Sequence, residues 1–139
     1  MDHPLILLGG KEDRAAGEQI AAHFSRPGAG SQACIYNACG LYSLNQSASL
    51  VRQAKIVFSH DTGLMHVAAA FRKKIFSIWG NTIPAFGMYP YKTEFSVLER
   101  PGLPCRPCSK IGYPECPQGH FKCMREIDFA VIPDFAKQD

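Results

Sequence analysis

A short polar turn in the middle of the chain carries side chains that could bind an anion. Asp61, Thr62 and Gly63 follow the apolar run 56–58 and open an Ala-rich segment that is typical of a helix. The start of a helix attracts negative charge, because its first amides lack intrahelical acceptors and its macrodipole is positive there. Thr62 and His66 are four residues apart and therefore share one helix face. The turn is a candidate anion site, in which Asp61 caps the helix and Gly63 lets a ligand approach the backbone.

The same turn also has a purely structural interpretation, as a helix cap at a sterically easy corner. The carboxylate of Asp61 would repel a phosphate, so backbone amides and hydroxyl groups would have to hold such a ligand. Asp61 would then cap the helix or bind a hydroxyl group or a metal ion.

A second group of chemically active residues lies near the C-terminus. Its members are Cys105, Cys108, Cys116, His120 and Cys123. The four cysteines resemble a tetrahedral structural zinc site, with His120 as a substitute ligand, although their spacing is irregular for a zinc ribbon. Two alternatives stay open: a pair of disulfides, which a cytoplasmic protein disfavours, and reduced thiols that only fix a loop.

Short apolar runs alternate with helix-like segments before this cysteine-rich part. The runs are residues 5–8, 34–36, 56–58, 75–78 and 95–98. Such alternation predicts an α/β fold, a Rossmann-like doubly wound parallel sheet with helices on both faces. Ligands of these sheets bind beyond the carboxyl ends of the strands, so the loops that leave the strands should lie on one edge. We expect residues 1–100 to form this domain and residues 101–139 to form a Cys/Pro-rich tail that packs on it.

The composition limits the classes of function. The chain has 139 residues, 46% of them hydrophobic and 19% charged, as in a soluble globular protein. Its net charge of +3 is too small to indicate a nucleic-acid partner. No apolar run approaches the ~20 residues that a membrane span requires, and the N-terminus does not look like a secretion signal. We therefore expect a cytoplasmic protein.

Several motifs along the chain resemble one enzyme family. They are residues 7–13, 40–44, 61–66 and 79–84, together with the cysteine-rich tail. In this order they are similar to the C-terminal half of the ADP-heptose:lipopolysaccharide heptosyltransferases, glycosyltransferase family nine. The resemblance implies the GT-B architecture, in which two Rossmann-like domains face each other across a cleft. The C-terminal domain holds the nucleotide-sugar donor, and the N-terminal domain supplies the acceptor surface and the catalytic base.

The resemblance also implies roles for individual residues. The donor diphosphate and sugar would be contacted by Asp61, Thr62, Gly63 and His66, the ribose by Glu12 or Asp13, and the adenine by Tyr42, with Thr82 near the same pocket. His66 would stabilise the leaving group, and no catalytic base is expected among these residues.

The resemblance predicts the donor-binding half of a heptosyltransferase-like enzyme that transfers a sugar from ADP-heptose to a lipopolysaccharide core precursor. No cofactor would be required, and a structural zinc ion bound by the tail cysteines stays an open alternative. Since the N-terminal acceptor domain is absent from these residues, we expect this chain alone to be inactive. The full-length protein would be cytoplasmic, or peripheral at the inner membrane. The alternatives are another GT-B nucleotide-sugar enzyme and a non-enzymatic, zinc-stapled binding module.

Overall fold

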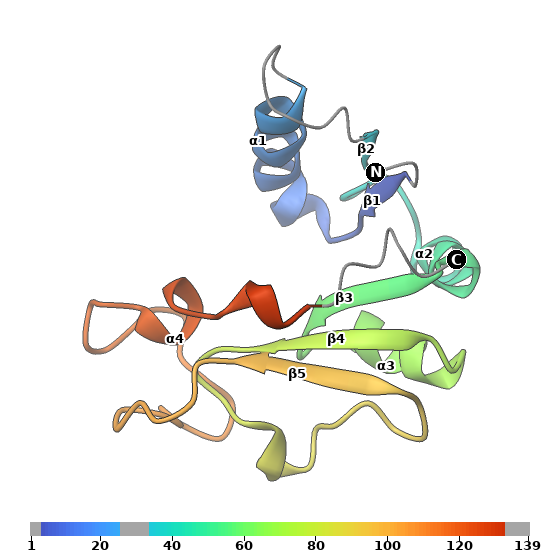
Figure 1. The fold of residues 1–139 in the computed structure, drawn as a ribbon. Coiled ribbons are helices and arrows are strands. Elements are labelled where there is room, and N and C mark those ends of the chain that lie inside the picture. The colour runs from blue at the N-terminus through green and yellow to red at the C-terminus, as the bar shows by residue number, and fades with distance from the viewer. Residues whose placement is uncertain (1–3, 26–33, 133–139) are drawn as a thin grey trace. The chain divides into compact units, whose positions relative to one another are not determined.

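The strands that the structure describes pair in parallel, and α-helices or a 3-10 turn lie in the connections between them (Figure 1). The computed structural model describes residues 4–25 and 34–132. It divides between Ser47 and Ala48 into two compact units, which are described separately below. The α/β class with parallel strands, predicted from the alternation of apolar runs, is confirmed. No helix in the described part of the chain is long and apolar enough to cross a membrane.

The first unit contains a two-stranded sheet and a helix. Its elements are β1 (Leu5–Leu7), the 3-10 turn η1 (Lys11–Asp13), α1 (Arg14–Phe24) and β2 (Ile35–Asn37). Leu5 pairs with Ile35, and the ladder runs in parallel to Asn37. Helix α1 packs against β2, and Gly17 is its buried residue. A Cβ at Gly17 would collide with the side-chain amide of Asn37, so the close approach of helix and strand requires glycine there.

Ser43 and Gln46, three positions apart, match the capping-box pattern in the sequence, and this box starts helix α2 (Leu44–Gln53). The Ser43 amide donates to Gln46 Oε1 at 2.9 Å, and the Gln46 amide donates to Ser43 Oγ at 3.4 Å. These reciprocal bonds satisfy two amides that a helix start leaves without intrahelical acceptors.

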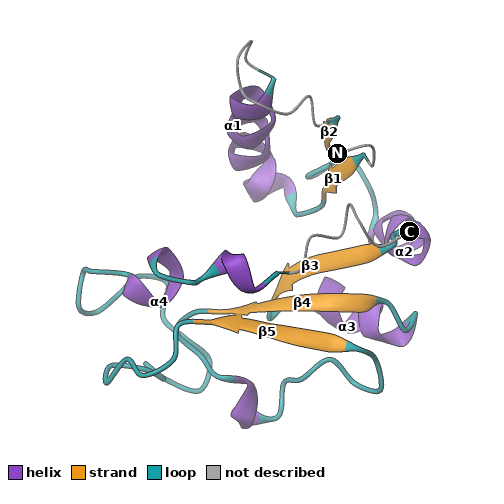
Figure 2. Cartoon of the chain, in the orientation of Figure 1, coloured by secondary structure: helices purple, strands orange, loops and turns teal. Residues whose placement is uncertain are grey.

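The second unit is built on a three-stranded parallel sheet in the order β3-β4-β5 (Figure 2). Its elements are β3 (Ile56–His60), α3 (Gly63–Ala70), β4 (Lys74–Trp79), the 3-10 turn η2 (Pro84–Phe86) and β5 (Phe95–Glu99). Helix α3 packs on β3 and β4 and buries Met65, Ala68 and Ala69. Phe76 and Trp79 of the central strand are the largest fully buried side chains, which identifies β4 as the centre of this core.

The described part of the tail, residues 101–132, belongs to the second unit and is mostly irregular. It contains α4 (Lys122–Arg125) and the 3-10 turn η3 (Phe129–Val131). Figure 1 shows α4 beyond the arrowheads of β4 and β5. The expected domain boundary after residue 100 stays a prediction.

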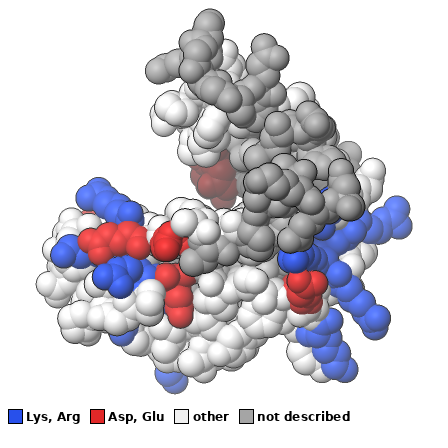
Figure 3. Space-filling view, in the orientation of Figure 1, with Lys and Arg blue, Asp and Glu red and all other residues white. Residues whose placement is uncertain are grey.

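Acidic side chains lie among the basic ones on the face drawn in Figure 3. Two ion pairs at the surface join residues of opposite charge, Arg100 with Glu126 at 3.3 Å and Lys74 with Glu94 at 2.9 Å. The mixture of signs agrees with the small net charge. The expected lack of a nucleic-acid partner stays a prediction.

The contact between Gly17 and Asn37 leads to a stability prediction. We expect Gly17→Ala to lower the free energy of unfolding by about 1 kcal/mol, since overpacking costs about 1–3 kcal/mol and the helix propensity of Ala regains at most about 1 kcal/mol. Urea unfolding followed by circular dichroism measures this change. Gly63→Ala is the matched control, because in the part of the chain that the structure describes no atom lies within 4 Å of a Cβ built there. A higher urea midpoint for Gly17→Ala, which helix propensity alone predicts, would contradict the packing argument.

Candidate functional site

The turn between β3 and α3 holds the predicted anion-binding residues. Thr62 is the N-cap of α3, with an extended backbone at φ −139° and ψ 165°. The prediction that Asp61 caps this helix is therefore wrong, because the helix begins one residue later than expected. Thr62 Oγ1 makes no cap hydrogen bond and lies 3.2 Å from Ser59 Oγ, which itself donates to the His60 carbonyl. Ser59 is thus the acceptor of the Thr62 hydroxyl, and a ligand oxygen would have to replace it.

The first turn of α3 offers unused donors. The Met65 amide donates to the Thr62 carbonyl at 3.1 Å, whereas the amides of Gly63 and Leu64 have no acceptor within residues 4–25 and 34–132. Thr62, Gly63 and His66 are exposed, and the space that a Cβ of Gly63 would face is empty to 4 Å. Free amides, the positive end of the helix dipole and open space therefore coincide at this helix start.

The loop after β4, residues 80–82 (the β4 loop), lies at the same edge of the sheet as this turn. Strands β3 and β4 run in parallel, and their last paired residues are His60 and Ile78. The chain leaves both strands in the same direction directly after this pair. Thr82, the weaker donor candidate, is half-buried in the β4 loop. The structure thus brings the β3–α3 turn and the β4 loop to one edge, as predicted for this part of the sheet.

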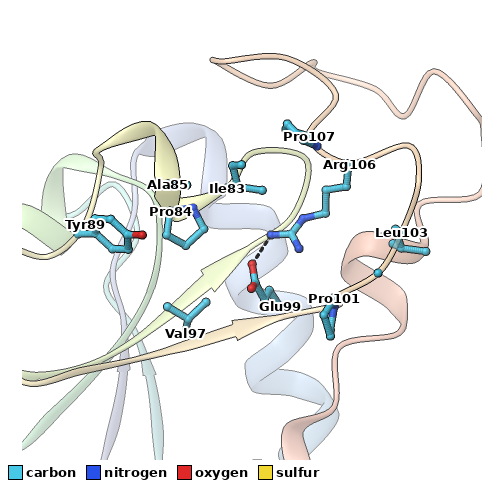
Figure 4. Close-up of a pocket in the computed structure, with 11 residues that line it drawn as sticks. Ile83, Pro84, Ala85, Tyr89, Val97, Glu99, Pro101, Leu103, Arg106 and Pro107 are labelled. Carbon is cyan, nitrogen blue, oxygen red and sulfur yellow. Dashed lines mark hydrogen bonds and ion pairs between the residues drawn. The ribbon is translucent and has the colours of Figure 1, made fainter.

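Arg106 of the tail holds the β4 loop, and the sequence did not identify this role. Its Nε donates to the Gly80 carbonyl at 2.5 Å, and its Nη2 donates to the Thr82 carbonyl at 3.1 Å. Nη2 also pairs with Glu99 Oε2 at 2.6 Å (Figure 4). The Arg106 side chain is only 6% exposed. Basic and acidic residues alternate in the tail sequence, a pattern that is typical of a solvated face, and the sequence neighbours of Arg106 do not identify it as a buried residue.

The predicted ribose and adenine residues lie in the first unit. Asp13 Oδ2 accepts the Gly10 amide at 2.8 Å, so this carboxylate serves the turn after β1. Glu12 is exposed, and its carboxylate has no partner in the described part of the chain, so it is the freer of the two ribose candidates. Tyr42 OH lies 3.2 Å from Tyr36 OH, and this hydrogen bond raises the pKa of Tyr42 above its usual value.

The loops after β1 and β2 are joined at one edge of the first sheet. The Gly40 amide donates to the Gly9 carbonyl at 3.0 Å, and Gly40 has a positive φ of 71°, where its missing Cβ lets Lys11 approach. Glu12, Asp13 and Tyr42 therefore belong to the first unit, and the other predicted donor residues belong to the second. The assembly of all of them into one site stays a prediction.

The tail cysteines are free thiols in the structure. Cys105 Sγ lies 3.7 Å from His120 Nε2, but no three His, Cys, Asp or Glu side chains in the described residues are grouped as metal ligands. Structural zinc at Cys105, Cys108, Cys116 and Cys123 therefore stays a prediction.

The thiols of the tail differ in acidity. The Phe121 amide, which donates to Cys116 Sγ at 3.4 Å, is the main cause of a lowered Cys116 pKa. Burial raises the pKa of Cys108 and of Cys123, and the nearby thiolates act in the same direction. Cys116 is therefore the thiol of these three that ionises first.

An open cavity of about 470 Å³ lies beside β5 and η2. Figure 4 shows its lining, which includes Ile83, Pro84, Tyr89, Glu99 and Arg106. None of the predicted donor residues lines it. The cavity therefore lies apart from the predicted donor-binding residues, and the position of the donor site stays a prediction.

Comparisons with known proteins point to one family. Residues 2–117 match the model of glycosyltransferase family 9 (heptosyltransferase). Lipopolysaccharide heptosyltransferase 2 from Escherichia coli strain K12 is 32% identical over 84 residues, which are 60% of this chain and 23% of that protein. Lipooligosaccharide heptosyltransferase 2 from Haemophilus ducreyi is 33% identical over 84 residues, which are 59% of this chain and 23% of that protein. The chain spans about a quarter of the length of these relatives.

Two solved structures have a similar fold. The E. coli ADP-heptose lps heptosyltransferase II matches with a TM-score of 0.61 and 25% identity, over 89% of this chain and 36% of that chain. A glycosyl transferase of family 9 from Veillonella parvula matches with a TM-score of 0.58 and 21% identity, over 69% of this chain and 25% of that chain. The second match supports the fold alone.

The thiol acidities lead to a prediction about alkylation. At pH 7 iodoacetamide should modify Cys116 faster than Cys108 and Cys123, because the thiolate is the nucleophile and the Cys116 thiol has the lowest pKa of the three. Peptide mapping by mass spectrometry gives the rates. A parallel sample with a chelator shows whether bound zinc slows the alkylation of the thiols. Metal analysis shows whether the untreated sample contains zinc. Faster modification of Cys123 than of Cys116 in the chelated sample would refute the predicted order.

Proposed function

The chain belongs to glycosyltransferase family 9, the heptosyltransferase family, and we propose that it forms the donor-binding part of a heptosyltransferase-like glycosyltransferase. The donor would be a nucleotide-sugar such as ADP-heptose, and the acceptor a lipopolysaccharide core precursor. An N-terminal acceptor domain of the full-length enzyme would complete the cleft. The start of α3 is the observation that carries this proposal.

A diphosphate fits the start of α3 by its charge. The amides of Gly63 and Leu64 have no acceptor within the described residues, and the helix dipole adds positive potential at the same place. Glycosyl transfer develops negative charge on the leaving diphosphate as the glycosidic bond breaks. Fixed donors aimed at that charge stabilise the transition state more than the ground state. The start of α3 can therefore bind the diphosphate of the donor and also stabilise it as the leaving group.

The glycine at position 63 supports a ligand at this place. Packing does not require glycine at position 63, because no atom of the described residues lies within 4 Å of a Cβ built there. This contrasts with Gly17, whose Cβ would collide with Asn37. A bound diphosphate that touches the backbone at position 63 accounts for a glycine there.

Thr62 and His66 would hold the oxygens of the donor. Both side chains are exposed, and His66 lies on the turn of α3 directly after the free amides. A histidine Nε2–H or Nδ1–H donates to a phosphate or sugar oxygen, and a protonated His66 would also offset the charge of the leaving group. Asp61 is half-buried and would bind a sugar hydroxyl, since it does not cap the helix.

The nucleoside would be bound by residues of the first unit. The carboxylate of Glu12, which has no partner among the described residues, suits a ribose hydroxyl, and the ring of Tyr42 suits an adenine face. Transfer to an acceptor further requires that the acceptor hydroxyl be held in line with the sugar carbon. In this proposal that task, together with general-base catalysis, belongs to the N-terminal acceptor domain.

Calorimetric titration of the chain with ADP, UDP and GDP tests this proposal. We expect ADP to bind most tightly. Gly63→Ala should weaken ADP binding about tenfold, equivalent to about 1.4 kcal/mol, because the added methyl group occupies the diphosphate space. His66→Ala should also weaken binding, whereas His23→Ala, an exposed helical histidine of the first unit, is the matched control.

Two outcomes count against the proposal. An unchanged ADP affinity for Gly63→Ala would remove the diphosphate from the start of α3. A preference for UDP or GDP would keep the nucleotide-sugar site but favour another GT-B enzyme over a heptosyltransferase-like one.

A further inference from the structure

The tail binds every carbonyl of the β4 loop. Arg106 donates to the carbonyls of Gly80 and Thr82, and the Cys108 amide donates to the Asn81 carbonyl at 2.8 Å. The Asn81 side chain donates in turn to the Tyr113 carbonyl at 2.9 Å. The conformation of the β4 loop is therefore set by residues of the tail.

Side-chain packing fixes the same loop from another direction. A Cβ on Gly80 would lie 2.6 Å from Met124 Sδ, so α4 packs directly against the loop backbone. A Cβ on Gly112, which has a positive φ of 79°, would lie 2.5 Å from Asn81 Oδ1. These close approaches leave the loop little freedom to move relative to the tail.

Arg106 is the centre of these interactions and cannot be replaced by a simple charge. Its guanidinium donates in several directions at once, to Gly80, Thr82, the Arg100 carbonyl and the Glu99 carboxylate. A lysine ammonium keeps the charge but lacks this planar fork of donors. Because the side chain is 6% exposed, water cannot replace bonds that are lost.

The orientation of the loop carbonyls determines where the loop amides point. The C=O and N–H of a trans peptide group point in opposite directions. Each amide of residues 81–83 therefore points away from the tail group that binds the preceding carbonyl. None of these amides has an acceptor within the described residues. They are available as donors at the sheet edge that carries the start of α3.

We propose that Arg106 is a positioning residue of the donor site, which holds the β4 loop with the amides of residues 81–83 directed at the bound nucleotide diphosphate. This inference rests on the proposed donor-binding function. In this proposal Arg106 does not contact the nucleotide-sugar, since its guanidinium N–H groups are hydrogen-bonded to the loop and to Glu99. Its effect on donor affinity is transmitted through the loop backbone.

Nuclear magnetic resonance of the 15N-labelled chain tests this role with ADP as the probe. Addition of ADP should shift the amide signals of residues 81–83 together with those of residues 63–66. In Arg106→Lys the signals of residues 81–83 should move or broaden before ADP is added, and the ADP dissociation constant should rise about tenfold, which is the loss of about 1.4 kcal/mol. Arg100→Lys, which alters the exposed pair with Glu126, is the matched control and should keep both properties.

The outcomes separate this inference from the proposed function. If ADP shifts residues 63–66 but leaves residues 81–83 unchanged, the inference is overturned and the donor site at α3 stands. If ADP shifts neither group, the proposed function fails and this inference fails with it. Arg106→Lys that binds ADP as tightly as the wild type also overturns it. The titration of the wild-type chain tests the contact of residues 81–83 with ADP, on which the role of Arg106 depends, even if Arg106→Lys does not fold.

Discussion

A buried cation must have its charge and its hydrogen bonds satisfied, and Arg106 imposes this constraint on the second unit. Its carboxylate partner, Glu99, is the last residue of β5, and its carbonyl partner Gly80 directly follows β4. Removing the partner of a buried charge costs about 3–5 kcal/mol, whereas an exposed ion pair contributes about 0–1 kcal/mol. The ion pair of Arg106 and Glu99 therefore contributes more to the stability of the second unit than the exposed pair of Arg100 and Glu126. The tail, β4 and β5 are joined at the position of this one side chain.

Parallel pairing supplies the second constraint. Adjacent parallel strands end at the same edge of the sheet, so the turn after β3 lies beside the loop after β4. The first of these loops leads into α3 and so presents free amides and a helix dipole. The second loop is held by the tail. In the proposed function the diphosphate of the nucleotide-sugar binds to the turn between β3 and α3. The tail affects this binding indirectly, because it holds the loop after β4.

The features that the sequence predicted correctly are determined by residues that lie close together in the sequence. The capping box of Ser43 and Gln46 is a local motif, so its residue types are sufficient to identify it. The parallel α/β class follows from the alternation of apolar runs and helix-like segments. The helix cap was misplaced by one residue, because Asp61 and Thr62 are both good N-cap residue types and only the backbone of the folded chain, which is extended at Thr62, shows where the helix begins.

The role of Arg106 could not be predicted in the same way. Its partners Gly80, Thr82 and Glu99 lie 7 to 26 positions earlier in the chain. No periodicity or motif connects these positions, and a charged residue in a loop is usually solvated. The collision of a Cβ at Gly17 with Asn37 is a second feature of this kind, since it appears only when α1 packs on β2.

The position of a bound nucleoside diphosphate tests the central claim most directly. A crystal structure of the chain with ADP is predicted to place oxygens of the diphosphate within hydrogen-bond distance of the amides of Gly63 and Leu64. A diphosphate bound elsewhere, for example in the cavity lined by Glu99 and Arg106, would contradict the assignment of the donor site to the start of α3.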